Sequence, residues 1–326
     1  MFHTDLLSVR TRRAVLAAML TVAMLLGPLA ALTAAQDDEP LQVVASFSAL
    51  ADIVRQVGGD HIEVTSLVPA GGDVHTFDAS PDDIRTLEDA DLVVQVGDDY
   101  EPWLDDLLET AGDDVPRYEA FAAIDHNLSE HGDEHEGDDH AGDSHDRGDE
   151  VHRWLDVQAV IHTVTHLGET LAEIDPDNAD AYTANAETYI AELEELDAWI
   201  VEQTATIPED QRELITVHHS MGAFADAYGY EIVGVLLESH STEGADASAG
   251  HVAELVEIVE EREIPVLFVD TPGGEDLLQP VASEADVEIA PPLYVETLSA
   301  DGEGPQSYIE MMRYNVETIV NALSRS

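Results

Sequence analysis

Short runs of β-branched and other apolar residues alternate along this chain with longer stretches in which apolar residues recur every three or four positions. Runs of the first kind predict buried strands, and the longer period predicts amphipathic helices. In the first half of the chain the predicted elements are strands over Leu41–Phe47, Ile62–Val68 and Asp91–Val96 and helices over Ser48–Val57, Pro81–Asp89 and Trp103–Thr110. Strands and helices in alternation predict a parallel sheet with helices on both faces.

The second half repeats this pattern after two consecutive helices. The first of these two helices is predicted over Leu155–Ile174 and ends before Pro176. The second is long and is predicted over Asn178–Thr204. Beyond Pro208 the predicted elements are strands over Glu213–Val217, Glu231–Leu237, Pro265–Val269 and Val287–Ala290 and helices over Met221–Tyr228, Ala249–Glu263 and Ser307–Leu323.

These elements predict an α/β fold of two similar lobes, each with a mainly parallel sheet flanked by helices. The N-terminal lobe is expected over residues 41–177, a rigid linking helix over 178–204 and the C-terminal lobe over 207–326. Open parallel sheets bind ligands beyond the carboxyl ends of their strands. We therefore expect the binding site in the cleft between the lobes.

The N-terminus has the pattern of an export signal, which we predict over residues 1–35. Arg10, Arg12 and Arg13 precede an apolar stretch, Ala14–Ala35, that ends in small residues. The protein is therefore expected in the periplasm or on the extracellular face of the cell membrane. The apolar stretch is also long enough to span a bilayer, so an uncleaved anchor is the alternative.

The composition is strongly acidic. Asp and Glu number 70 against 12 basic residues, all of them Arg, and the formal net charge is −58. Such a surface repels nucleic acid and attracts cations, and its self-repulsion weakens in salt. We interpret it as adaptation to a salty habitat, the alternative being an acidic but ordinary secreted protein. The chain has no Cys, which excludes disulfides, thiolate ligands and a lipid-modified N-terminal cysteine.

A segment over residues 126–151 consists almost wholly of Asp, Glu, Gly and His. It has no apolar run with which to form a core, so it is predicted to be a solvated loop. Its histidines are His126, His131, His135, His140 and His145. Imidazole suits zinc, copper, nickel and iron(II). We interpret the segment as an auxiliary, low-affinity metal collector, the alternative being an acidic linker in which His is incidental.

Three further histidines lie where the predicted cleft would be. His75 follows the second predicted strand, His152 stands at the entry to a helix, and His218 follows the first strand of the second half. Connecting segments of this kind are where rigid scaffolds place ligand-binding residues.

The segments around these histidines resemble, in order, the signatures of the zinc and manganese solute-binding proteins of ABC importers (cluster A-I type). The matching segments are Gly72–Asp78 with Ser80–Ile84, Val151–Asp156, Thr216–Ala225, and Tyr294–Ser299 with Tyr308–Asn315. The acidic, His-rich loop of that family also precedes the second signature, as it does here. The resemblance spans the chain from about Leu41 to its end.

The resemblance implies capture of a metal ion outside the cytoplasm and its delivery to a membrane permease and, through it, an ATPase. It implies a monomer with no catalytic activity, and His75, His152 and His218 as metal ligands. The family usually has Asp as the fourth ligand, where this chain has Glu296. Three imidazoles and one carboxylate suit four-coordinate zinc, so zinc is the predicted cargo; manganese, which prefers more oxygen ligands, is the alternative.

Two other classes of function remain open on the sequence. A zinc hydrolase is suggested by His162 and His166, but the Glu that such sites carry after the first His is absent, so the pair is interpreted as a helix face. Glu238, His240, Glu243 and His251 show no comparable spacing. The other class is a metal-dependent adhesin or metal buffer, which binding to a permease would separate from an importer subunit.

Overall fold

The computed structural model describes residues 39–97, 100–112, 115–121, 151–237, 247–270, 274–300 and 302–325. The predicted export signal and the histidines of the acidic loop lie outside these residues. Within them, no helix combines the length and the apolar character that crossing a bilayer requires.

The first lobe is built on a parallel sheet with the strand order β2-β1-β3-β4. Its strands are β1 (Leu41–Phe47), β2 (Ile62–Val68), β3 (Leu92–Gln95) and β4 (Arg117–Glu119). Strand β1 pairs on both sides, and its residues from Val43 to Phe47 are buried. The hydrophobic pattern predicts β1, β2 and β3, but it misses β4 because that three-residue edge strand has no apolar run.

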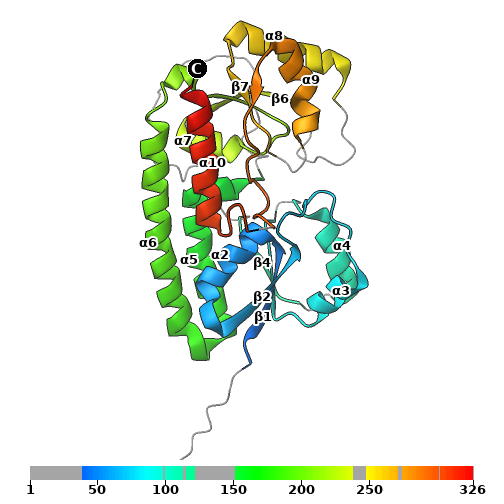
Figure 1. Ribbon diagram of the computed structural model, residues 1–326. Coiled ribbons are helices and arrows are strands. Elements are labelled where there is room, and N and C mark those ends of the chain that lie inside the picture. The colour runs from blue at the N-terminus through cyan, green and yellow to red at the C-terminus, as the bar shows by residue number, and fades with distance from the viewer. Residues whose placement is uncertain are drawn as a thin grey trace, which may run out of the picture. The chain divides into compact units, whose positions relative to one another are not determined.

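Helices cover both faces of this sheet (Figure 1). On one face lie α2 (Ser48–Gly58), α5 (Val157–Ile174) and α6 (Ala179–Thr204), and on the other lie α3 (Pro81–Glu88) and α4 (Pro102–Ala111). Alternate residues of β1 point to opposite faces of the sheet and pack against different helices. Val43 and Ala45 join the core that includes α2, α5 and α6, whereas Val44 packs with the core of α3 and α4.

The second lobe has the same α/β character with shorter strands. Strand β5 (Glu213–Thr216) pairs parallel with β6 (Glu231–Val235), and β7 (Val266–Leu267) pairs parallel with β8 (Glu288–Ile289). Its helices are α7 (Gly222–Tyr228), α8 (Ala249–Arg262) and α9 (Glu275–Ala285). The strands predicted over Pro265–Val269 and Val287–Ala290 are thus reduced to two paired residues each, and α9, which contains Pro280, was not predicted.

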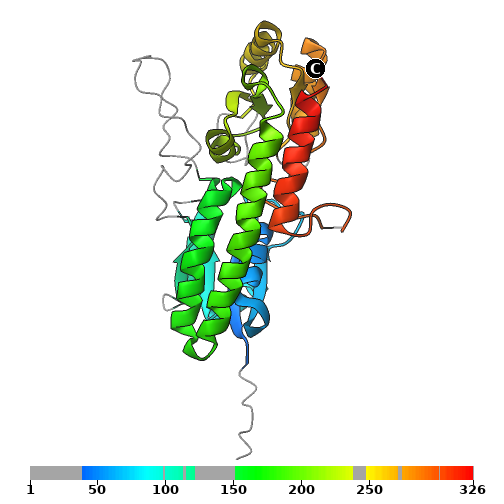
Figure 2. The same cartoon turned by 90° about the vertical axis from the view of Figure 1, so that its left-hand side faces the viewer.

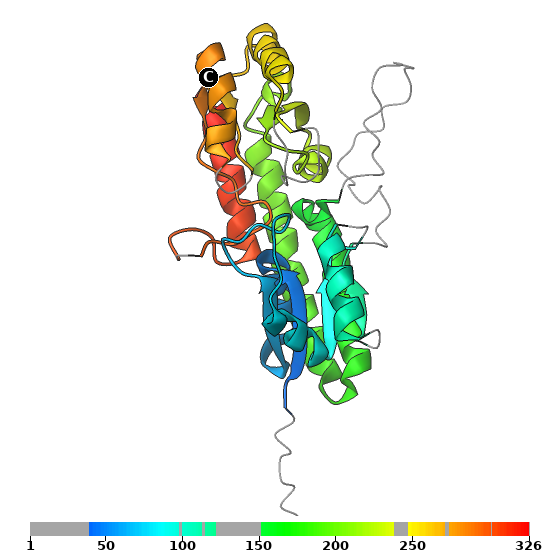
Figure 3. The same ribbon diagram turned by 90° about the vertical axis from the view of Figure 1, so that its right-hand side faces the viewer.

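The long helix α6 packs along α5 on one side and along α10 (Tyr308–Leu323) on the other, as Figure 2 shows. Its buried stripe, from Tyr182 to Ile200, belongs to a single hydrophobic core that also contains β1 and α7. Short 3-10 turns join several elements: η1 (Gly59–His61), η2 (Arg153–Leu155), η3 (Pro176–Asn178) and η4 (Glu209–Gln211). Figure 3 shows α6 and α10 from the opposite side. The two-lobed α/β fold and its long connecting helix are therefore as predicted.

A buried carboxylate ties three helices together beside this core. Asp197 of α6 accepts a hydrogen bond from Gln158 of α5 (2.8 Å) and another from the hydroxyl of Tyr228 in α7 (2.9 Å). Burial, followed by the nearby charge of Asp197, raises the pKa of Tyr228 well above its usual range. The hydroxyl therefore remains protonated and serves as a permanent donor.

We expect Tyr228→Phe to lower the free energy of unfolding by about 2 kcal/mol, because a hydrogen bond to a charged group contributes roughly 1.5–3 kcal/mol. Urea denaturation in high salt measures this change. Tyr314→Phe is the matched control, since Tyr314 is a half-buried tyrosine of α10 whose ring packs edge-on against Tyr294. Equal effects of the two substitutions would contradict the role given to Asp197.

Candidate metal centre

His75 is held by the loop that follows β2. Oδ1 of Asp73 accepts hydrogen bonds from the backbone N–H groups of His75 (2.8 Å) and Thr76 (3.3 Å), which fixes the turn. Gly71, two residues earlier, donates its N–H to the carbonyl of Leu298 (2.9 Å). Gly71 has φ +78°, and a Cβ there would lie 2.9 Å from the Cβ of Ala300, so this close approach requires glycine. The His75 loop is thereby tied to the segment after β8.

His152 directly precedes the turn η2 and is fully buried. The neighbouring Trp154 donates its indole N–H to the carbonyl of Val295 (2.7 Å), and the hydroxyl of Tyr308 donates to the carbonyl of Trp154 (2.7 Å). His152 is therefore anchored to the same segment after β8 that contacts the His75 loop.

His218 comes two residues after the end of β5 and is also fully buried. Asp270, which follows β7, holds this turn: it accepts the backbone N–H of Val217 (2.9 Å) and the hydroxyl of Ser220. Its Oδ2 also lies 3.1 Å from Nδ1 of His218, a close ionic contact that is poorly aligned for a hydrogen bond.

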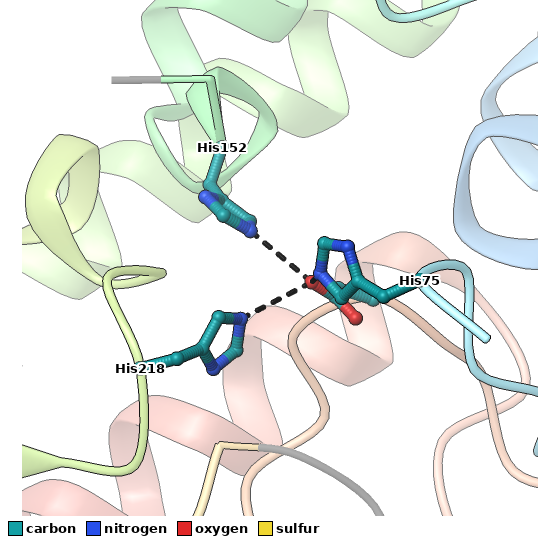
Figure 4. Close-up of side chains that lie close together, drawn as sticks. His75, His152 and His218 are labelled. Atoms are coloured by element: carbon teal, nitrogen blue, oxygen red, sulfur yellow. Dashed lines mark hydrogen bonds and ion pairs between the residues drawn. The ribbon is translucent and has the colours of Figure 1, made fainter. Parts of the chain in front are cut away.

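Glu296 brings the three histidines together. Figure 4 shows how the rings of His75, His152 and His218 converge. Its Oε1 lies 2.7 Å from Nε2 of His75, 3.1 Å from Nε2 of His152 and 3.3 Å from Nε2 of His218. One ligand atom from each of the four residues falls within 4.8 Å of all the others. The second oxygen of Glu296, Oε2, is buried and accepts no well-aligned hydrogen bond among the described residues, although the hydroxyl of Tyr100 interacts with this carboxylate. We call these four residues the His3Glu cluster.

The charges of the cluster are strongly coupled. Burial alone would raise the pKa of Glu296, but its contacts with the three histidines hold that pKa well below its usual range. Burial alone would lower the pKa of His218, but Asp270 and Glu296 outweigh it and raise the pKa to about 10. Without a metal ion, the cluster therefore keeps a proton on His218 at neutral pH, between two buried carboxylates.

Tyr100, which lies between β3 and α4 in the chain, packs against the cluster. The ring of Tyr100 packs edge-on against His75 (5.6 Å between centroids) and His152 (5.4 Å) and lies 5.1 Å from Trp154. Sequence reasoning missed Tyr100 and Asp270. The sequence could have indicated Asp270, because this residue directly follows a predicted parallel strand. No sequence pattern indicates Tyr100.

The remaining candidate residues lie apart from the cluster. His162 and His166 face outward on α5, and His251 of α8 lies 2.8 Å, through Nε2, from the carbonyl of Val235. Glu238, His240, Glu243 and the five histidines of the acidic loop fall outside the described residues. Of the sequence-based candidates, His75, His152, His218 and Glu296 are the ones in the described part of the chain that form a group of at least three metal-ligating side chains.

The sequence profile of the family described as zinc-uptake complex component A, periplasmic (ZnuA), matches residues 43–322. The chain belongs to this family. It is thus a metal-binding, solute-binding protein of the ABC-transporter type and not an enzyme, as the resemblance implies.

Two relatives carry names that specify a metal. The manganese-binding lipoprotein MntA of Halalkalibacterium halodurans is 35% identical over 291 residues, which are 89% of this chain and 91% of the relative. MntA of Bacillus subtilis is 30% identical over 88% of this chain and 90% of the relative.

Solved structures agree on the fold. The periplasmic zinc-binding protein TroA of Treponema pallidum superposes with a TM-score of 0.75 at 24% identity, covering 87% of this chain and 99% of that structure. The manganese-bound periplasmic metal-binding protein of Candidatus Liberibacter asiaticus gives a TM-score of 0.73 at 20% identity, with 87% and 100% covered. At these identities the likeness establishes the two-lobed fold alone.

We expect Asp270→Asn to weaken metal binding by about 10- to 100-fold, the usual cost of removing a residue that orients a ligand. Asn keeps the acceptor for Val217 but removes the charge beside Nδ1 of His218. Competition with a chelator measures the affinity. Asp197→Asn is the control, a buried carboxylate of α6 outside the cluster, and an equal loss in both variants would point to a general loss of structure.

We also expect metal binding to release about one proton from His218 between pH 7 and 9, since a ligating imidazole must be neutral. The pKa of His218 is raised to about 10, above its unfolded value near 6.5. The stability that this proton gives the metal-free protein is complete below pH 6.5 and is lost as the pH rises through 10. Calorimetry in two buffers with different ionisation enthalpies counts the protons. No release at pH 7.5, or the same release from His218→Ala, would contradict this charge state.

Proposed function

We propose that the protein captures a divalent metal ion outside the cytoplasm and delivers it to the permease of an ABC importer, whose ATPase drives uptake. The observation that carries this proposal is the His3Glu cluster, in which three imidazole Nε2 atoms converge within 3.3 Å of one buried carboxylate oxygen. His75, His152, His218 and Glu296 are the proposed ligands.

The cluster has the character of a carrier site. A catalytic metal keeps a coordination position open for water or substrate, whereas protein ligands fill a closed site. The side chain of His75 is 6% exposed and those of the other three ligands are buried. A bound ion would therefore leave only when the ligands move apart.

Parts of the chain on both sides of α6 supply the ligands. His75 and His152 precede this helix, whereas His218 and Glu296 follow it. This arrangement supports the division into an N-terminal lobe (41–177), a linking helix (178–204) and a C-terminal lobe (207–326). Release to a permease would then consist of a relative movement of the two lobes that pulls the ligand set apart.

We propose manganese as the cargo and zinc as its competitor. The relatives that are 35% and 30% identical are named manganese-binding. The carboxylate of Glu296 supports the same choice, because a carboxylate that binds through both oxygens adds an oxygen ligand, which suits manganese better than four-coordinate zinc. Three imidazoles still favour zinc, so the zinc prediction remains the second candidate.

The segments outside the described residues keep their proposed roles. Residues 1–35 would act as an export signal that places the protein on the outer side of the membrane. The His-rich loop would hold metal weakly, as an auxiliary collector. The net charge of −58 would concentrate cations around the exported protein.

Titration of the mature protein in high salt, with a chelator that masks weak sites, tests the function. We expect one tightly bound ion per chain and a loss of affinity of at least about 100-fold in His218→Ala, since a ligand is removed outright. His251→Ala is the matched control, a half-buried histidine outside the cluster. Tight binding that survives His218→Ala would refute the His3Glu cluster as the site.

Uptake by membranes that contain the cognate permease and ATPase then separates the two cargoes. Affinity alone does not, because zinc binds almost any nitrogen and oxygen site more tightly than manganese. We expect manganese to accumulate in a manner that depends on His218, and zinc to block it. Zinc accumulation instead would make zinc the cargo.

A further inference from the structure

A second pair of histidines lies on the outer face of α5, away from the His3Glu cluster. His162 and His166 are one helical turn apart, and their Nε2 atoms are 3.2 Å from each other. The rings lie 4.4 Å apart between centroids. The side chain of His166 is 48% exposed, so an ion from solvent could reach the pair.

The distance between the two nitrogens matches a metal chelate. Zinc–nitrogen bonds of 2.0–2.1 Å at a tetrahedral angle place two imidazole nitrogens about 3.3 Å apart. The only other arrangement that suits two such nitrogens is a hydrogen bond in which one ring donates and the other accepts. The position of the protons on the rings therefore decides what the pair can bind.

Glu169 favours the tautomer that a metal requires. Its Oε2 lies 3.0 Å from Nδ1 of His166. A carboxylate accepts the proton of Nδ1–H, which leaves the lone pair of Nε2 directed at His162. Metal-binding histidines in proteins are commonly oriented by such a carboxylate on the other ring nitrogen.

The second ring is also suited to bind as a neutral ligand. Burial and the neighbouring His166 lower the pKa of His162. The helix between the two rings is fixed in place, because Thr163 donates to the carbonyl of Ala120 (2.5 Å) and accepts at its own carbonyl from the hydroxyl of Tyr118 (3.0 Å). The spacing of the two imidazoles is therefore set before any ion arrives.

We propose that His162 and His166, oriented by Glu169, form a second metal site on the surface of α5 that takes an ion with a preference for imidazole, namely Zn²⁺, Ni²⁺ or Cu²⁺. Water fills its remaining positions. With two nitrogen ligands and no direct carboxylate, the site does not retain Mn²⁺, which prefers oxygen. It shares no residue with the His3Glu cluster and goes beyond the proposed function, because the two sites can hold different ions at the same time.

Histidine modification by diethyl pyrocarbonate, read residue by residue with mass spectrometry, tests this site in the full mature chain. The reagent attacks the free imidazole nitrogen, so a bound ion protects the ring. We expect Zn²⁺ to slow modification of His162 and His166 together, by about tenfold or more, and Mn²⁺ to leave both unchanged. His251 is the internal control, because its Nε2 lies 2.8 Å from the carbonyl of Val235 and it has no ring contact with another histidine among the described residues.

Two variants distinguish chelation from a general effect of zinc. In His166→Ala, protection of His162 should disappear, and in Glu169→Gln the zinc concentration for half-protection should rise by about tenfold. Equal modification at saturating Zn²⁺, or protection of His162 that persists in His166→Ala, would overturn the proposal. The readout comes from α5 alone, so it stands whether or not the His3Glu cluster proves to be the carrier site.

Discussion

A single buried carboxylate organises the centre of this protein. Taking Glu296 out of water is costly unless opposite charge and hydrogen bonds compensate, and the three imidazoles on its Oε1 provide that compensation. The compensation is incomplete without an added cation, because the one proton on His218 faces two buried carboxylates, Glu296 and Asp270. A divalent ion would replace a proton and supply the missing positive charge, so affinity for metal follows from the electrostatics of the empty cluster.

The segment that carries Glu296 is held mainly by the other lobe. Leu298 donates its N–H to the hydroxyl of Ser48 in α2 (2.9 Å), and its carbonyl accepts the N–H of Gly71. Asp52 of α2 accepts the N–H of Tyr308 at the start of α10 (2.8 Å). In the second lobe, the side chain of Asn315 in α10 holds this segment through hydrogen bonds to both the N–H and the carbonyl of Tyr294. The segment that carries Glu296 is therefore bonded to elements on both sides of α6.

The sequence predicts the strands and helices of the fold better than it predicts which distant residues meet in the His3Glu cluster. Each ligand histidine could be found because it follows a parallel strand or opens a helix, and the order of strands and helices was sufficient for the fold class. The meeting of Glu296 with residues 221, 144 and 78 positions away is not contained in any local pattern; only the family resemblance indicated it. Strand β4 and helix α9 were missed for local reasons, since one lacks an apolar run and the other contains Pro280.

Ligand chemistry also explains how one chain can sort metal ions. The buried His3Glu cluster combines three imidazoles with a carboxylate, so as the proposed site it would accept ions over a wide range of oxygen preference. The pair of His162 and His166 on α5 is accessible to solvent and has only nitrogen ligands, so it selects for zinc, nickel and copper. An acidic surface raises the local concentration of all cations without distinguishing them. Discrimination therefore rests on which ligand atoms are buried together, and in this fold Glu296 is the residue that makes the central site differ from the surface one.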